Sequence, residues 1–411
     1  MEVMHHCCAG LDVHKDTVVA CFRRALPDGL VENQVKTFAA TTAGLLELGD
    51  WLVEQKATIA AMESTGVYWK PVWNLLEGRL DLMLVNARDV KQVPGRKTDV
   101  KDCQWIAQLL QHGLLRPSFV PDRPQRELRD LTRQRTQLVA DKARVSNRIQ
   151  KVLEDANVKL GSVASDVLGA SGRDMLKALI AGDADAAAMA ELARYRMRTK
   201  IPQLREALSG KVTAHHRFML KMLLEQVEHL DEQIAAFDQQ VQEVMSPLEK
   251  QAIQRLDAMP GIDVRSAQVI VAEVGTDMRR FPNEHHLASW AGLSPGNHQS
   301  AGKRRSGRTS PANRWLRTTL CQCALAAGRK KGSYYSAQYR RIAARRGRKR
   351  AAIAVAHSQI VAIYHLLDGA EHRDLGADYF DKLGSERLKR NLVSRLERLG
   401  YKVNLEEKPA A

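Results

Sequence analysis

Four carboxylates stand where a metal-dependent phosphoryl-transfer site would need them. Asp12 ends an apolar segment in GLDVHKD, and Glu63 ends another in AMESTGVY. Asp99 and Asp102 follow in KTDVKD at an expected helix start, three residues apart and therefore on one helix face. Carboxylates at strand ends, with a pair on a nearby helix, can hold two Mg²⁺ ions that clamp the attacking and leaving oxygens of a phosphate. We predict such a site, in which Mn²⁺ can substitute.

The elements that would position these carboxylates follow from the hydrophobic pattern. Residues 8–23 predict a strand, a turn and a second strand, and residues 35–38 a third strand. Further short buried strands are expected at 58–62 and 81–86, and helices at 41–55, 67–76 and 98–115. The order β-β-β-α-β-α-β-α resembles the ribonuclease-H-like fold more than a Rossmann domain. The predicted class is therefore α/β, followed by a mainly helical remainder.

The remainder of the chain begins with a Pro-rich stretch, residues 117–124, which ends the first domain. A long charged helix is expected at 125–159 and several short helices at 162–212. Apolar residues then alternate in steps of three and four from Leu220 to Val244, the pattern of a coiled coil. This seam can pair with the 125–159 helix or with a second chain, and we favour the second chain.

The segment Leu256–Gly275 predicts a helix, a tight Pro-Gly turn and a helix. It resembles a helix-hairpin-helix, whose turn amides approach a phosphate, although an ordinary helical hairpin fits the same pattern. A basic helix at 334–350 and an apolar helix at 351–367 follow. We expect four parts, with boundaries at 1–118, 119–250, 251–370 and 371–411.

The charge of the chain is concentrated in one stretch. The net charge is +16, and the residues from Ser300 to Arg350 contain sixteen Lys and Arg without any Asp or Glu. A localised basic footprint is typical of a nucleic-acid site, whereas a general solubility charge would be spread out. An anionic membrane surface is the other alternative, but no lipid-facing anchor accompanies the stretch.

The cellular compartment is predicted from what the sequence does not contain. We find no apolar run close to the roughly 20 residues that cross a bilayer and no signal-peptide pattern at the N-terminus. The six cysteines have no CxxC or zinc-ligand spacing. We expect a bacterial cytoplasmic protein with reduced thiols and no membrane partner, associated with the nucleoid when it is bound to DNA.

Four motifs carry a resemblance that covers almost the whole chain. They are, in order, GLDVHKD, MESTGVYWKPVW, LVNARDVKQVPGRKTDVKDCQWIAQLL and GLSPGNHQSAGKRRSGRTSPANRWLR. Together they resemble the insertion sequence 110 family of transposases. The resemblance implies a RuvC-like nuclease domain with an Asp-Glu-Asp-Asp tetrad, which corresponds to Asp12, Glu63, Asp99 and Asp102, and a mainly helical transposase domain that bears a serine.

The implied nucleophile is Ser300, in HQSAGK. The residues alone do not choose it over its neighbours Ser289, Ser294, Ser306 and Ser310; the resemblance does. It implies that Oγ attacks a DNA phosphate and leaves a covalent phosphoserine link. A serine hydroxyl needs activation, which metal ions held by the tetrad can supply. The family often has Gly after this serine, and this chain has Ala301.

Basic side chains beside both sets of residues are candidates for phosphate binding. They are Arg96, Lys97, Lys101, Lys303, Arg304, Arg305, Arg308, Arg314 and Arg317. Four aromatic residues near the charge can stack on unpaired bases or pack in a core, namely Trp315, Tyr334, Tyr335 and Tyr339. The resemblance further implies donor and target DNA, a structured non-coding guide RNA that pairs with both, and a homo-oligomer, a dimer or a tetramer, assembled through the coiled coil.

Two alternatives stay open at this point. A junction-resolvase-like metal nuclease would use the tetrad with water and would not need the serine. A non-catalytic nucleic-acid-binding protein would need only the seam and the basic stretch. We favour the RNA-guided, Mg²⁺-dependent transposase or recombinase, with the tetrad of one chain and the serine of another forming a composite site.

Overall fold

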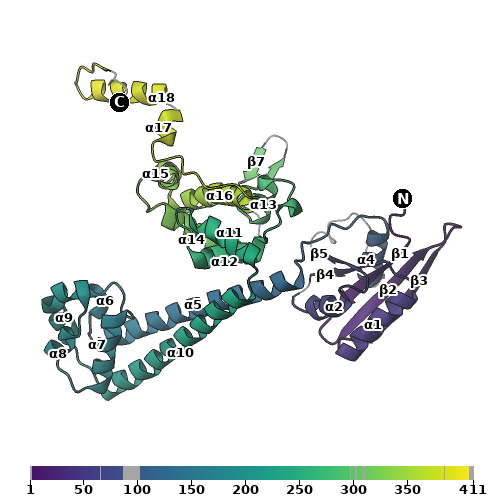
Figure 1. The fold of residues 1–411 in the computed structure, drawn as a ribbon, viewed down its shortest axis with the longest axis horizontal. Coiled ribbons are helices and arrows are strands. Elements are labelled where there is room, and N and C mark those ends of the chain that lie inside the picture. Colours follow the sequence, from purple (N-terminus) through teal and green to yellow (C-terminus); the bar gives the residue numbers. More distant parts are fainter. Residues whose placement is uncertain are drawn as a thin grey trace. The chain divides into compact units, whose positions relative to one another are not determined.

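The computed structural model describes residues 2–64, 66–86, 102–296, 298–300, 303–307, 309, 312–383 and 385–406. The chain forms two compact units, Met1–Pro121 and Asp122–Ala411 (Figure 1). The finer division into four parts stays a prediction.

The first unit is built on a mixed five-stranded sheet. Its strands are β1 (Cys7–Val13), β2 (Thr17–Ala25), β3 (Val31–Ala39), β4 (Ile59–Glu63) and β5 (Asp81–Val85). The order across the sheet is β3-β2-β1-β4-β5. The first three strands form an antiparallel meander, and β1, β4 and β5 run parallel. The predicted α/β unit is confirmed. β3 is longer than the expected 35–38. Its first residues, 31–34, are mostly polar and exposed or half-buried, so no apolar run marks them in the sequence.

Helices cover both faces of this sheet. α1 (Thr42–Glu54) and α2 (Trp69–Leu76) bury Leu45, Leu48 and Leu76 against the odd-numbered side chains of β1, among them Leu11. α4 (Asp102–Gln111) covers the opposite face, where Ile106 and Leu110 pack on Cys8 and Ala61. The helices at 41–55 and 67–76 are confirmed, and the expected 98–115 helix is confirmed from Asp102 to Gln111, since residues 98–101 lie outside the described residues.

The second unit begins with two long helices that lie side by side (Figure 1). α5 (Arg123–Asp155) leads away from the C-terminal helices and α10 (Ala214–Val244) returns to them. Short helices cap the far end of the pair: α6 (Leu160–Val163), α7 (Ala170–Ala181), α8 (Ala186–Glu191), η1 (Tyr195–Lys200) and α9 (Ile201–Leu208). The predicted long helix and the cluster of short helices are both confirmed.

The partner that we favoured for the heptad seam is wrong. Seam residues Leu220, Val227 and Ile234 are buried in one cluster with Val145 and Ile149 of α5. The seam is therefore covered within the chain. The reason is geometric: the helices 162–212 turn the chain back on itself, so that α10 reaches α5 without a second chain.

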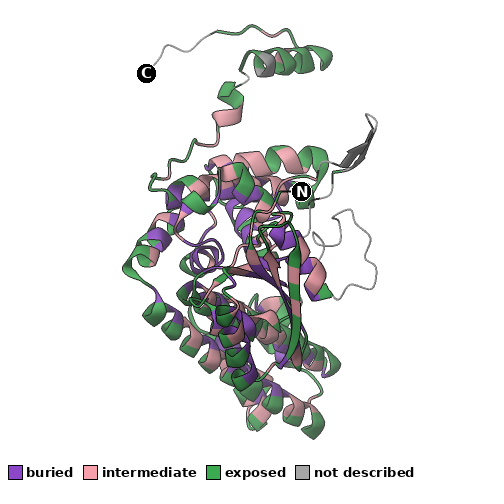
Figure 2. Cartoon of the chain, turned by 90° about the vertical axis from the view of Figure 1, so that its right-hand side faces the viewer, coloured by how far each residue is buried: buried purple, intermediate pink, exposed green. Residues whose placement is uncertain are grey.

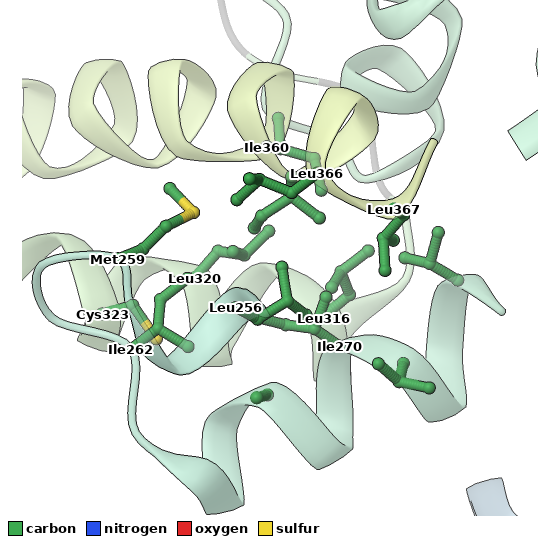
Figure 3. Close-up of a cluster of buried hydrophobic side chains, with 14 of the residues drawn as sticks. Leu256, Met259, Ile262, Ile270, Leu316, Leu320, Cys323, Ile360, Leu366 and Leu367 are labelled. Atoms are coloured by element: carbon green, nitrogen blue, oxygen red, sulfur yellow. The ribbon is translucent and has the colours of Figure 1, made fainter. Parts of the chain in front are cut away.

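The C-terminal helices form a separate core in this unit. They are α11 (Pro247–Asp257), α12 (Val264–Val274), η2 (Met278–Arg280), α13 (Glu284–Trp290), α14 (Arg314–Ala327), α15 (Tyr334–Arg346) and α16 (Arg348–Leu367). Figure 3 shows how Leu256 of α11, Ile270 of α12, Leu320 of α14 and Ile360 of α16 meet in the centre. A two-stranded hairpin, β6 (His298–Ser300) and β7 (Lys303–Ser306), stands between α13 and α14.

The predicted helix, tight turn and helix at 256–275 are present, as the end of α11, a turn and α12. Gly261 in the turn has φ +86°, and a Cβ there would lie 2.3 Å from the carbonyl oxygen of Cys323 in α14. The glycine thus permits close packing on α14, and Gln359 Nε2 donates to the Pro260 carbonyl from α16 at 3.1 Å. This packing supports the ordinary helical hairpin over a turn that approaches a phosphate.

α16 is by length and composition apolar enough to cross a membrane, which the sequence analysis did not anticipate. Its apolar residues are accounted for by the core, because Val355, Ile360 and Ile363 are fully buried. Beyond it, α17 (Tyr379–Leu383) and α18 (Ser385–Arg398) are largely exposed (Figure 2). The six cysteines form no disulfide. Burial raises the pKa of Cys8 to about 12 and that of Cys323 to about 11, so neither thiol ionises readily.

Candidate functional site

Asp12 and Glu63 lie at the same end of two adjacent parallel strands. β1 and β4 pair in register from Cys8 opposite Ile59 to Leu11 opposite Met62, so that the next residues are Asp12 and Glu63. Glu63 in turn pairs with Val85 in β5. Since side chains alternate along a strand, Asp12 shares a face with Cys8, and this is the face that α4 covers.

Glu63 shares that face as well. It stands two residues beyond Ala61, which packs in the cluster under α4. The β1–β4 register therefore brings the first two predicted carboxylates to one face and one end of the sheet.

Asp102 is brought to this end by the direction of α4. Its last residue, Gln111, accepts backbone hydrogen bonds from Met4 before β1, and the Cys8 thiol contacts the Ala107 carbonyl at 3.6 Å. Cys103, the residue after Asp102, lies over Gly10. The helix therefore runs antiparallel to β1 and begins near the carboxyl ends of β1 and β4.

The close approach of α4 depends on Gly10. A Cβ at this position would lie 2.2 Å from the Cys103 carbonyl oxygen and 2.4 Å from the Ala107 nitrogen, both of them backbone atoms. No side chain fits between strand and helix, so the glycine sets the height at which Asp102 stands above Asp12.

The carboxylate of Asp12 is partly open to solvent. Its side chain is 28% exposed, and its Oδ2 lies 3.2 Å from Nε2 of His14, which is itself exposed. An exposed oxygen beside an imidazole can exchange that contact for a cation. Three carboxylates are the donor chemistry that Mg²⁺ and Mn²⁺ take, and the residues fit such ions in type.

The four predicted ligands are not assembled as a set in the structure. Within the described ranges, no three His, Cys, Asp or Glu side chains are grouped closely enough to hold a metal ion. Asp99 lies outside the described residues. The fold brings Asp12, Glu63 and Asp102 to one end of the sheet, and the tetrad stays a prediction.

Ser300 ends β6, directly before the turn of the hairpin. Its backbone pairs with Lys303 of β7, and an irregularity in the register falls between His298 and Gln299. The side chains of the hairpin, and all of Ala301 and Gly302, lie outside the described residues. The structure thus places the backbone of Ser300 at the end of β6 and does not describe its side chain.

The start of α14, after the hairpin, is anchored by a buried charge network that sequence analysis missed. Asn313 caps α14 by accepting from the amides of Trp315 and Leu316, and its Nδ2 donates to Glu273 at 2.6 Å. Glu273 is fully buried at the end of α12 and also binds Arg133 of α5. An acidic residue in the apolar run VIVAEV was the signal that could have indicated it.

The predicted nucleic-acid-binding residues divide into two groups. Arg314 and Arg317 lie on the first turns of α14, where the Arg314 guanidinium stands 4.7 Å from the Trp315 ring centroid. For the others the structure describes no side chain: Arg96, Lys97, Lys101 and Arg308 lie outside the described residues, and Lys303, Arg304 and Arg305 only have their backbone in β7.

The aromatic residues beside the charge are not equivalent. Tyr335 is buried, and Tyr334 packs among Tyr335, Tyr379 and Phe380, so these two serve the fold. Tyr339 is half-buried and lines an open pocket on α15.

Comparison with known proteins connects both units to one family. Residues 9–158 match a family model described as a transposase of the DEDD type of insertion sequence 110, and residues 253–340 match one described as transposase of the IS116/IS110/IS902 family. A protein of Streptomyces coelicolor described as insertion element IS110 uncharacterized 43.6 kDa protein is 28% identical over 256 residues.

That alignment covers 57% of this chain and 61% of the relative. Both matched segments are of the transposase class, and together they take up more than half of the chain. The chain belongs to the IS110 family of transposases.

Proposed function

We propose that this protein is a DNA transposase or recombinase that cuts and rejoins strands through a covalent phosphoserine. The observation that carries the proposal is the convergence of Asp12, Glu63 and Asp102 from β1, β4 and α4 at one end of a mixed sheet, within the matched segment 9–158. The strand order and the three carboxylates favour a ribonuclease-H-like, RuvC-like unit.

The carboxylates of Asp12, Glu63, Asp99 and Asp102 would hold Mg²⁺, or Mn²⁺ in its place. When bound, two such ions neutralise the charge of the phosphate and favour ionisation of a nearby hydroxyl. The protein would supply oxygen ligands from a rigid sheet, and the sheet would fix the spacing of these ligands before the substrate arrives.

Ser300 would be the nucleophile. Its Oγ forms a bond to phosphorus while the bond between phosphorus and the leaving strand's oxygen breaks, and the serine proton passes, in net terms, to that leaving hydroxyl. The phosphodiester energy stays in the serine ester, so a second strand's hydroxyl can reverse the step and rejoin DNA. Basic residues of β7 and α14 would hold the phosphates on either side.

A structured non-coding RNA would supply sequence choice by pairing with donor and target DNA. The basic stretch from Ser300 to Arg350 supports a backbone-binding role of this kind. Such a protein would work in the bacterial cytoplasm, on nucleoid DNA.

The tetrad and the serine would come from different chains of a homo-oligomer. They belong to different compact units joined at residues 121–122, which supports sharing between chains. Because α5 covers the heptad seam, the chains would associate through another surface. Mixing an Asp12→Ala chain with a Ser300→Ala chain tests this: regained strand cleavage is expected, and a mixture as inactive as either variant alone would contradict it.

Cleavage of element-end DNA tests the catalytic part. Asp12→Asn and Glu63→Gln are expected to abolish Mg²⁺-dependent cutting, whereas Asp28→Asn in the β2–β3 turn should leave it intact. A junction-resolvase-like nuclease is the alternative. If the protein is such a nuclease, its Ser300→Ala variant would still cut DNA. A non-catalytic binding protein would not cut DNA, and none of these substitutions would change that result.

A further inference from the structure

A pocket of about 710 Å³ opens between α14, α15 and α16, and its lining includes no residue of the hairpin and none of the predicted carboxylates. This volume is in the usual range for small-ligand sites. Its apolar lining residues include Cys321, Leu325, Ala352 and Ile353. Its other lining residues are Tyr339, Gly328 and the four cations Arg317, Arg329, Arg348 and Lys349.

The four cations have no anionic partner in the described part of the chain. None of them forms an ion pair or a side-chain hydrogen bond there, and the stretch from Ser300 to Arg350 contains no Asp or Glu. Some cations elsewhere in the same unit do have acidic partners: Arg135 Nη1 lies 2.8 Å from Asp238, and Lys142 and Arg173 share Asp231. Four unneutralised cations around one pocket indicate an anion from outside the chain.

Tyr339 is held in place at the side of this pocket. A Cβ on Gly328 would lie 2.8 Å from the Cγ of Tyr339, so the ring rests directly on the end of α14. A ring fixed in this way loses little entropy when a second flat group stacks on it. Aromatic rings beside cations are the usual platform for unpaired bases.

We propose that this pocket binds one unpaired nucleotide. Its base would stack on Tyr339 and contact the apolar lining residues, and its flanking phosphates would meet Arg317, Arg329, Arg348 and Lys349. A free phosphate would leave the apolar lining residues without a contact, and a paired base inside a duplex cannot enter a pocket. The inference rests on the proposed function only in that the protein meets nucleic acid; single-stranded DNA and single-stranded RNA both present this chemistry.

Binding of labelled single strands to the full chain tests the base contact. Fluorescence anisotropy would be measured without Mg²⁺ on oligonucleotides of about ten nucleotides, as DNA and as RNA. Tyr339→Leu is expected to weaken binding about tenfold, as loss of one stacked base does, with an unchanged salt dependence. Tyr195→Leu is the matched control, because Tyr195 is 91% exposed at the far end of the α5–α10 pair.

The phosphate contacts give a second, independent measurement. Arg348→Gln and Lys349→Gln, both at exposed positions, should each reduce the slope of log K against log salt by roughly 0.7, the value for one single-strand phosphate. Lys331→Gln, in the same basic stretch but outside the pocket lining, should leave the slope unchanged. These variants keep the test decisive even where Tyr339→Leu lowers the unfolding temperature.

The outcomes distinguish RNA from DNA as the source of the nucleotide. They also test the pocket separately from the proposed transposase function. A larger loss on RNA than on DNA assigns the pocket to a guide strand, the reverse assigns it to a DNA strand, and equal losses mean that it accepts either. Tyr339→Leu binding as tightly as Tyr195→Leu, with unchanged slopes for Arg348→Gln and Lys349→Gln, would overturn the inference. Since no cleavage is measured, a chain without transposase activity would still give a clear answer.

Discussion

Arg133 holds the carboxylate of Glu273 with two parallel hydrogen bonds, Nε to Oε1 at 2.6 Å and Nη2 to Oε2 at 2.7 Å, across 140 residues of sequence. Arg129 Nε lies 3.5 Å from the same carboxylate, and Asn313 donates to it from the start of α14. One buried residue thus ties α5, α12 and the element that follows the serine-bearing hairpin.

Glu273→Gln is expected to destabilise the second unit by about 3–5 kcal/mol, because it leaves buried guanidinium groups without a counter-charge. Burial already lowers the pKa of Arg129 to about 10, against the opposing influence of Glu273. Urea denaturation measures the effect. Glu225→Gln, whose partner Lys221 stands 4.0 Å away on an exposed helix face, is the control and should change stability by at most about 0.5 kcal/mol. Equal midpoints for the two variants would contradict the anchor.

Gly10→Ala is expected to reduce Mg²⁺-dependent cleavage about a hundredfold, since a shift of the order of 1 Å in a reacting group has that effect. The new methyl would meet backbone atoms of Cys103 and Ala107, so α4 and Asp102 must move away from β1. Cleavage rates at saturating Mg²⁺ give the measurement. Gly161→Ala, where the nearest atom is 3.8 Å away, should leave the rate unchanged. Full activity of Gly10→Ala would show that the height of α4 is irrelevant.

We expect the folded state to lose stability in mild acid because of His357. Burial, and then the neighbouring His285, lower its pKa below the usual value. The unfolded chain therefore takes up the proton first as pH falls through about 6.5, and the folded state loses stability between about pH 7 and pH 5. Thermal midpoints measured across this range should fall less steeply for His357→Gln than for the wild type. The exposed His229→Gln should follow the wild type, and a steeper fall for His357→Gln would refute the assignment.

The first unit was the most predictable part of the chain. Its strands are mostly short apolar runs with clear ends. The order of β1, β4 and α4 in the sequence was enough to predict that Asp12, Glu63 and Asp102 lie at one end of the sheet. The outer half of β3 was missed because an exposed edge strand needs no apolar residues.

Long-range partners were not predictable from periodicity. The seam from Leu220 to Val244 specifies an apolar helix face but not what covers it. Contacts with the covering helix span 61 to 103 residues of sequence, beyond any local signal. In the same way the apolar surroundings of Glu273 in the sequence could indicate burial but not its partners, because Arg133 and Asn313 come from distant segments. The pocket at Tyr339 could not be predicted from the sequence, because its lining residues come mainly from three helices, α14, α15 and α16.

Serine chemistry at position 300 would leave a covalent protein–DNA adduct that can be detected on a denaturing gel. The reaction would contain the protein, Mg²⁺, the RNA transcribed from beside its gene and element-end DNA, with wild type beside Ser300→Ala and, as a control from the same hairpin, Ser306→Ala. We expect an adduct that is lost in Ser300→Ala and kept in Ser306→Ala. Cleavage without an adduct, unchanged in Ser300→Ala, would contradict it and indicate a nuclease that uses water.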